Sequence, residues 1–335
     1  RDALAFSPDS KAIAFARGYS IRVWPLSKDK APPQEWGGGG GDMAFSPDGR
    51  MLASCGGGLC LVEARSGRVQ WRLTESVFCS VAFSPDGKSI ATGELDGAVR
   101  LRDALDGTEV RTLLQMAKPV EFVEFSPDGR WLAAGGREIP TSVLSLAEAS
   151  EAVRLDMDAW GGDGASFSAD GRLLATGSDN GKIAMWDPAT GREIALLADI
   201  DAGAYGVRLS SDGAWLAVNA GGSPALVEVA TREVADSAPW MHPDTTGPMD
   251  FTLDGRIAAT GGEDAVVRIW DLRTGKSLGR LEGHQSMVRP LRFSPDGALL
   301  ATGSTDGTVL VWDTAAWVTQ ARSGAPETTP EHREK

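Results

Sequence analysis

The chain has 335 residues, with 33 lysines and arginines against 46 aspartates and glutamates, and a net charge of −13. The basic residues are scattered, which argues against a groove for a nucleic-acid backbone. Three cysteines argue against a disulfide framework, and no apolar run reaches the roughly 18 residues of a membrane span, so no membrane insertion is expected.

A five-residue phrase of the type Phe-Ser-Pro-Asp-Gly recurs eight times along the chain, at spacings of 38 to 42 residues. A fixed period of this length is typical of one supersecondary unit stacked on itself. The units begin their phrases at Phe6, Phe45, Phe83, Phe125, Phe167, Leu209, Phe251 and Phe293.

The last unit, residues 287–313, shows what each unit encodes. Apolar residues alternate with polar ones up to Phe293, as in a half-buried strand. Residues 295–297, Pro-Asp-Gly, predict a tight turn. A strand over 299–304 follows, and the Asp-Gly pair at 306–307 predicts a hairpin into a third strand.

In the preceding unit, Thr274-Gly275 turns the chain into a fourth strand near residues 276–281. Each unit is thus predicted to be a four-stranded antiparallel meander, which cannot bury both of its faces alone. A ring of such sheets can, so the sequence predicts an all-β fold, a β-propeller. The even spacing favours eight blades, and seven remains the alternative if the first unit lies outside the ring.

Two units carry a further set of residues at matching offsets from the anchor Phe. The two sets are His242, Thr260, Asp264 and Trp270, and His284, Thr302, Asp306 and Trp312. With them the chain resembles the WD-repeat (Trp-Asp, G-beta-like) family of β-propellers, and its regular phrasing is similar to bacterial members. The resemblance implies that each set forms a buried hydrogen-bonded tetrad.

Other units depart from this pattern. Unit five has Asn180 where the Asp belongs, and unit three has Arg102 where the Trp belongs. We therefore expect units seven and eight to be the rigid sector. The first half of the ring is expected to be locally less stable, because it lacks these polar networks.

The two ends of the chain bear on how the ring closes. The chain begins at Arg1 within the first strand of unit one, so we expect that residues once preceded it. Unit eight lacks the turn into a fourth strand, and its outer strand would come from such a segment or from residues 316–320. The propeller domain is expected to span 1–321, with a disordered tail over 322–335.

No catalytic residue, metal site or cofactor is predicted. Of three histidines, two belong to the tetrads and His332 lies in the tail, so no positioned base exists for a nucleophilic triad. Asp163 and Asp179 could approach each other, but a solvated acidic patch is favoured over a cation site. The cysteines Cys55, Cys60 and Cys79 are interpreted as small hydrophobes.

Propellers of the WD-repeat family commonly bind partners on the rim around the central channel. The positions that the family pattern exposes there are carried onto this chain residue by residue; ordinary surface residues are the alternative reading. They are Val77, Cys79, Leu95, Glu121, Arg137, Asp163, Asp179, Tyr205, Glu263, Met287, Arg289 and Thr305. A partner segment with a Lys or Arg beside an apolar anchor would suit such a rim. For Trp36, Trp160, Trp240 and Trp317, packing between blades is favoured over a role as interface anchors.

The sequence thus predicts a non-catalytic scaffold that binds a partner protein or peptide, as part of a larger signalling or regulatory protein, with a cytoplasmic localisation. The alternative is a periplasmic or enzyme-accessory propeller that binds a small ligand, because residues 6–16 also resemble repeats of TolB-like proteins and of peptidase-gating propellers.

Overall fold

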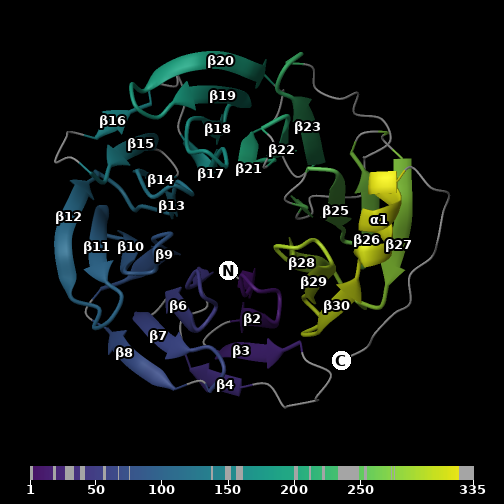
Figure 1. Cartoon of the computed structure of the whole chain (residues 1–335), viewed down its shortest axis with the longest axis horizontal. Helices are drawn as coiled ribbons and strands as arrows, with labels where there is room; N and C mark the ends of the chain where they lie inside the picture. Colours follow the sequence, from purple (N-terminus) through teal and green to yellow (C-terminus); the bar gives the residue numbers. More distant parts are fainter. Residues whose placement is uncertain are drawn as a thin grey trace.

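The computed structural model describes residues 3–17, 20–26, 34–37, 42–55, 58–66, 68–74, 76–136, 139–147, 152–155, 161–199, 203–210, 213–220, 223–232, 249–252, 255–272, 274 and 276–323. Within them the chain forms eight antiparallel sheets arranged in a ring, each sheet being one blade (Figure 1). The predicted eight-bladed β-propeller is confirmed, and the alternative of seven blades is wrong.

The first four blades are four-stranded meanders, and their strands follow one another from the centre of the ring outward (Figure 1). The strands are β1 (Ala3–Phe6), β2 (Ala12–Arg17), β3 (Ser20–Pro25) and β4 (Gln34–Gly37) in blade one; β5 (Met43–Phe45), β6 (Met51–Cys55), β7 (Leu59–Glu63) and β8 (Val69–Leu73) in blade two; β9 (Phe78–Phe83), β10 (Ser89–Glu94), β11 (Ala98–Asp103) and β12 (Glu109–Gln115) in blade three; and β13 (Phe122–Phe125), β14 (Trp131–Gly136), β15 (Ile139–Ser145) and β16 (Val153–Arg154) in blade four.

Blades five and seven also have four strands, whereas blades six and eight have three within the described residues. The strands are β17 (Gly161–Phe167), β18 (Leu174–Ser178), β19 (Lys182–Asp187) and β20 (Arg192–Asp199) in blade five; β21 (Ala204–Leu209), β22 (Trp215–Ala220) and β23 (Ser223–Glu228) in blade six; β24 (Met249–Phe251), β25 (Ile257–Gly261), β26 (Val266–Asp271) and β27 (Lys276–Glu282) in blade seven; and β28 (Val288–Phe293), β29 (Leu299–Ser304) and β30 (Val309–Asp313) in blade eight.

The hydrophobic core is divided among the blade interfaces. Eight apolar clusters are found in the described part of the chain, and each joins one blade to the next. The cluster of blades one and eight contains Leu4, Phe15 and Ala301, so the ring closes by side-chain packing at that interface. Each sheet therefore buries both faces only because two neighbours cover it, as expected for a repeat architecture.

The recurring Ser-Pro-Asp-Gly phrase folds as a hydrogen-bonded turn between the first and second strands of a blade. In blade three the hydroxyl of Ser84 donates to Asp86 at 2.6 Å and accepts the backbone N–H of Ser89 at 3.0 Å. The backbone N–H of Lys88 also donates to Asp86, at 3.1 Å. Gly87 closes the turn with a φ of 72°, a conformation that favours glycine. The turn role assigned to these aspartates from the sequence is confirmed.

These turns make the stability of the ring sensitive to acid. The serine hydroxyl is the main cause that lowers the pKa of Asp48 and Asp86, as it is for Asp9 and Asp170. A carboxylate with a lowered pKa stabilises the fold above its ordinary pKa near 4, and this contribution is lost as the pH falls through the lowered value. We expect the melting temperature to fall steeply below about pH 4.

The variant Ser46→Ala/Ser84→Ala isolates this contribution. It removes the bond to each Asp and the acceptor for a backbone N–H, which we expect to cost about 1–2 kcal/mol per turn at pH 7. Thermal melts between pH 7 and pH 3 should show a shallower acid dependence for the variant than for the wild type. Parallel curves for the two proteins would contradict this assignment.

Residues 316–320, considered above as an outer strand for blade eight, belong instead to a helix, α1 (Ala315–Ser323). Trp317 is buried in the cluster of blades seven and eight. A Cβ at Gly279 on β27 would lie 2.8 Å from its ring, so the missing side chain there gives the indole its place. The outer-strand interpretation is wrong, because these residues are helical and the helix buries Trp317 against blade seven. Its role in packing between blades is confirmed. The remainder of the expected tail, residues 324–335, lies outside the described residues.

Candidate functional site

The meander topology decides which predicted residues share a face. Successive turns of an antiparallel sheet lie at alternate ends, so the turns between second and third strands share one face with the segments that join consecutive blades. We call this the rim face. The turn Leu95–Gly97 and the segment 116–121 that leads into blade four both lie there, because Met116 donates its backbone N–H to Gly97 at 2.8 Å.

Val77 and Leu95 stand out among the predicted rim residues. Their exposed fractions are 49% and 52%. The backbone N–H of Leu95 donates to the carbonyl of Val77 at 2.9 Å, so the two residues are neighbours across the blade-three sheet. We call this pair the blade-three rim patch. Cys79, two residues further along the strand, is half-buried and does not extend the exposed surface.

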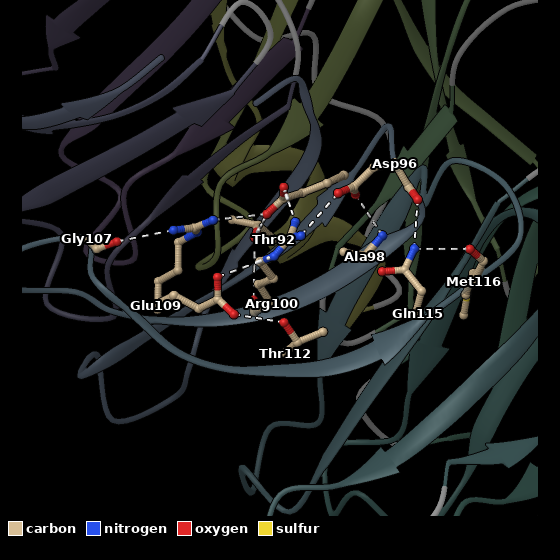
Figure 2. Close-up of polar contacts among 11 residues, drawn as sticks. Thr92, Asp96, Ala98, Arg100, Gly107, Glu109, Thr112, Gln115 and Met116 are labelled. Carbon is tan, nitrogen blue, oxygen red and sulfur yellow. Dashed lines mark hydrogen bonds and ion pairs between the residues drawn. The ribbon is translucent and has the colours of Figure 1, made fainter. Parts of the chain in front are cut away.

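A buried ionic network begins at the residue next to Leu95, and Figure 2 shows part of it. The side chain of Glu94, the residue before Leu95, is 1% exposed. It pairs with Arg100 through one oxygen, and with Arg102 at 3.1 Å through the other. The hydroxyl of Thr92 donates to the same carboxylate at 3.1 Å. Such a network fixes the direction of the chain at Leu95, because none of its members can turn away without stranding a buried charge.

Arg100 extends this network toward the surface. Its guanidinium contacts Asp96 at 3.1 Å and Glu109 at 3.4 Å, as Figure 2 shows. Burial opposes the charge of Arg100, but the hydrogen bond to Asp96 and the field of Glu94 outweigh it and raise its pKa. The N–H of Ala98 is the main cause that lowers the pKa of Asp96. Both groups therefore stay charged at neutral pH.

Arg102 replaces the tryptophan of the family pattern. It is paired with Ile90 in the sheet, as Trp312 is paired with Leu300 in blade eight. Its guanidinium carbon lies 5.3 Å from the centre of the Phe78 ring, within reach of a cation–π contact. The expectation that the first half of the ring lacks polar networks is therefore wrong for blade three, where ion pairs stand in for the tetrad.

The tetrad of blade eight is present, with Thr308 as an additional member. Trp312 donates its indole N–H to Thr302 at 2.9 Å, and Thr302 lies 2.8 Å from Nε2 of His284. Nδ1 of His284 lies 2.8 Å from the hydroxyl of Thr308, which donates to Asp306 at 2.6 Å. Since Thr308 donates to Asp306, His284 must donate from Nδ1 and accept at Nε2, as a neutral ring. Burial lowers the pKa of His284 in the same sense. Both of its nitrogens are used, so it is no free base.

The other tetrad elements follow the same geometry. Trp270 donates to Thr260 at 3.0 Å in blade seven, and Trp186 donates to Thr176 at 2.8 Å in blade five. Asp264 accepts from Arg268 at 2.7 Å. His242 lies outside the described residues, so the histidine of that tetrad stays a prediction.

The remaining rim predictions divide into three groups. Asp179, Glu263 and Thr305 are exposed, and Glu121 and Met287 are half-buried. Asp163, Tyr205 and Arg289 lie on innermost strands, but their side chains are outside the described residues, so the acidic pair of Asp163 and Asp179 stays untested. Arg137, Trp160 and Trp240 are also outside them. Within the described chain, only at blade three do two exposed aliphatic residues meet on this face.

Sequence reasoning missed Glu94, Arg100 and a groove on the opposite face. Glu94 stands where blades five and eight have Ser178 and Ser304, so an acid at the end of an apolar strand was the available signal. The groove lies between blades two and three and has a volume of about 680 Å³. Its lining includes Met51, Leu61, Phe83, Lys88 and Leu105, residues that two different blades contribute. No group of His, Cys, Asp or Glu suited to a metal is found among the described residues.

Comparisons with known proteins agree with this architecture. The model of the WD domain, G-beta repeat, matches residues 275–313. The model of the family described as outer membrane protein assembly factor BamB matches residues 9–278. Within the described residues, no helix has the length and apolar character to cross a membrane.

One curated relative and one solved structure add to these matches. Mitochondrial division protein 1 of Phaeosphaeria nodorum is 44% identical over 48 residues, which are 14% of this chain and 7% of that protein. The crystal structure of the computationally designed Ika8 protein superposes with a TM-score of 0.75, covering 92% of this chain and 95% of that one. At 19% identity, that likeness shows the fold alone.

Proposed function

Since the chain belongs to the β-propeller family described as outer membrane protein assembly factor BamB and ends in a WD repeat, we propose that it is a scaffold that binds a partner protein at the blade-three rim patch. The observation that carries the proposal is the exposure of Val77 and Leu95, about half of each side chain, next to a fixed ionic network. Exposed apolar residues on a rigid support are typical of binding anchors, because little side-chain entropy is lost on binding.

The other exposed large apolar residues do not form such a site. Val69, Val110, Ile194 and Leu196 lie on outer strands, at the circumference of the ring, and Leu105 lies on the opposite face. Asp96 stands beside Leu95 and is charged at neutral pH. The partner chemistry that suits this patch is therefore an apolar side chain next to a lysine or arginine.

Crosslinking tests the proposal directly. A photoreactive amino acid placed at residue 95 should capture a partner, whereas the same group at residue 110, on the outer strand of the same blade, should not. With the identified partner in hand, we expect Val77→Ala/Leu95→Ala to weaken binding by about thirtyfold, as for a central anchor. The matched control is Val110→Ala, 58% exposed in the wild type, which should change the Kd by less than about twofold.

Either of two results would reject the rim patch. Equal capture at residues 95 and 110 would mean contact without a specific site. An unchanged Kd for the double variant, with its fold intact, would move the binding site to another surface. Melting curves of the variants establish that the fold is intact.

The family match is compatible with a second candidate, a periplasmic or enzyme-accessory propeller that binds a small ligand. The groove between blades two and three, at about 680 Å³, has the size of a ligand site. We place the scaffold in the cytoplasm, as part of a larger regulatory protein, and fractionation of the native cells separates the two candidates. Recovery with periplasmic markers would favour the second.

A further inference from the structure

The innermost strand of each blade is a sheet edge that faces the centre of the ring (Figure 1). Edge strands leave backbone N–H groups without a ladder partner, and these need acceptors. In several blades the preceding blade supplies one. Ser166 accepts the N–H of Leu209 at 3.0 Å, and Asp250 accepts that of Phe293 at 2.8 Å. Glu124 accepts the N–H of Phe167 in the same way.

These three acceptors occupy one position of the repeat, directly before the anchor residue. In blades six and eight the same position holds Arg208 and Arg292. A guanidinium has donors only, so neither arginine can accept a backbone N–H from the next blade. The inter-blade hydrogen bond that explains Glu124, Ser166 and Asp250 does not explain the arginines.

The charged side chains of this position act on one another between blades. Arg292 pairs with Asp250 at 3.3 Å. Arg208 is the main cause that lowers the pKa of Arg292, so their positive charges act on each other. Glu124, four blades away from Arg292, also feels both arginines. Arg208 is exposed and the side chain of Arg292 is 39% exposed, so water reaches the centre at this level.

Among the described residues at the axis, the carboxylates have hydrogen-bond donors, whereas some arginine donors have no described acceptor. Each carboxylate already accepts a backbone N–H, and Asp250 also accepts from Arg292. Arg292 uses one of its donors on Asp250, and Arg208 makes no hydrogen bond or ion pair with any described residue. Two mutually repelling guanidinium groups, whose donors are not all used by described residues, are the arrangement that an oxyanion would stabilise, because a planar fork matches carboxylate and phosphate oxygens.

We propose that the centre of the ring is a binding site for a small oxyanion, held between Arg208 and Arg292. This site lies on the axis, apart from the blade-three rim patch, and does not depend on the proposed scaffold function. Asp250 and Asp42, whose negative charges both act on Arg292, limit it to small anions, because they repel a large polyanion.

Titration calorimetry on the purified chain tests the proposal, with inorganic phosphate in one arm and malonate in the other, at low and constant ionic strength. We expect one site per chain with a Kd below about 1 mM for at least one anion. Arg208→Gln should weaken it by at least about tenfold, since a charge-assisted bond is lost. Because Arg208 has no partner among the described residues, this variant should fold normally. The matched control, Arg192→Gln on the exposed face of β20, should stay within about twofold.

The outcomes separate clearly. Tighter binding of phosphate or of malonate identifies the class of anion. Absence of binding by the wild type overturns the proposal. So does an equal loss in Arg208→Gln and Arg192→Gln, which would indicate general screening by salt. Binding that survives Arg208→Gln, in a variant whose melting curve matches the wild type, also overturns it.

Discussion

Replacing Glu94 with glutamine is expected to lower the free energy of unfolding of the blade-three region by about 3–5 kcal/mol, because it leaves the buried charge of Arg102 without its partner. The side chain of Arg102 is only 10% exposed, so water cannot replace the carboxylate. The loss is a large fraction of the stability of a typical domain. Urea denaturation followed by tryptophan fluorescence measures it.

Two further variants show whether the stranded charge is the cause. Glu109→Gln removes a carboxylate from the outer end of the network, where it is 42% exposed, and should cost less than about 1 kcal/mol. The double variant Glu94→Gln/Arg102→Trp should recover part of the loss, because residue 102 follows Thr92 at the offset by which Trp186 follows Thr176. If Glu94→Gln and Glu109→Gln destabilise equally, the buried network does not hold blade three together.

The second large effect is expected in blade eight. Thr302→Val keeps the shape of a side chain that is fully buried, but removes the hydroxyl between Trp312 and His284. The indole N–H loses this acceptor and Nε2 of His284 loses its donor, at an expected cost of about 2–5 kcal/mol in unfolding free energy. Thermal and urea denaturation measure the loss.

The neighbouring substitution Thr305→Val serves as the control, because Thr305 is exposed on the rim face. Its hydroxyl bonds to Ser286 and Met287 at the surface, so the loss should stay at or below about 1 kcal/mol, well under that of Thr302→Val. Because the chain of hydrogen bonds needs a neutral His284, lowering the pH until the ring is protonated should destabilise the wild type more than Thr302→Val. A variant as stable as the wild type would mean that the tetrad contributes no net stability.

The sequence was sufficient for the blade count and for the tetrad of blade eight because both are repeated or local. Eight phrases at an even period require eight units, and the spacing of Thr302 and Trp312 places them on adjacent strands, with His284 in the segment just before the first strand of the same blade. The exposure of Val77 and Leu95 could also be predicted, because turn positions of a known repeat have a known orientation.

The features that could not be predicted depend on contacts between blades or on a single departure from the repeat. Glu94 is one acid in a strand that is otherwise apolar, and its meaning appears only when Arg100 and Arg102 are seen around it. Trp317 lies in a helix, and its indole ring packs on the neighbouring blade because Gly279, 38 positions earlier, has no side chain there. The groove between blades two and three and the arginines at the axis also arise only when the ring closes.

The closure between blades one and eight also has a mechanical consequence. Every other pair of neighbouring blades is joined by a peptide segment, whereas this pair is held by the packing of Leu4, Phe15 and their neighbours. A force applied between the two ends of the chain would therefore act first on this joint. The ring would open there into a curved row of eight blades that seven interfaces still hold together. Blades would then detach in order from either end of the row. Fusion partners attached to both ends would load the one joint that no covalent bond crosses.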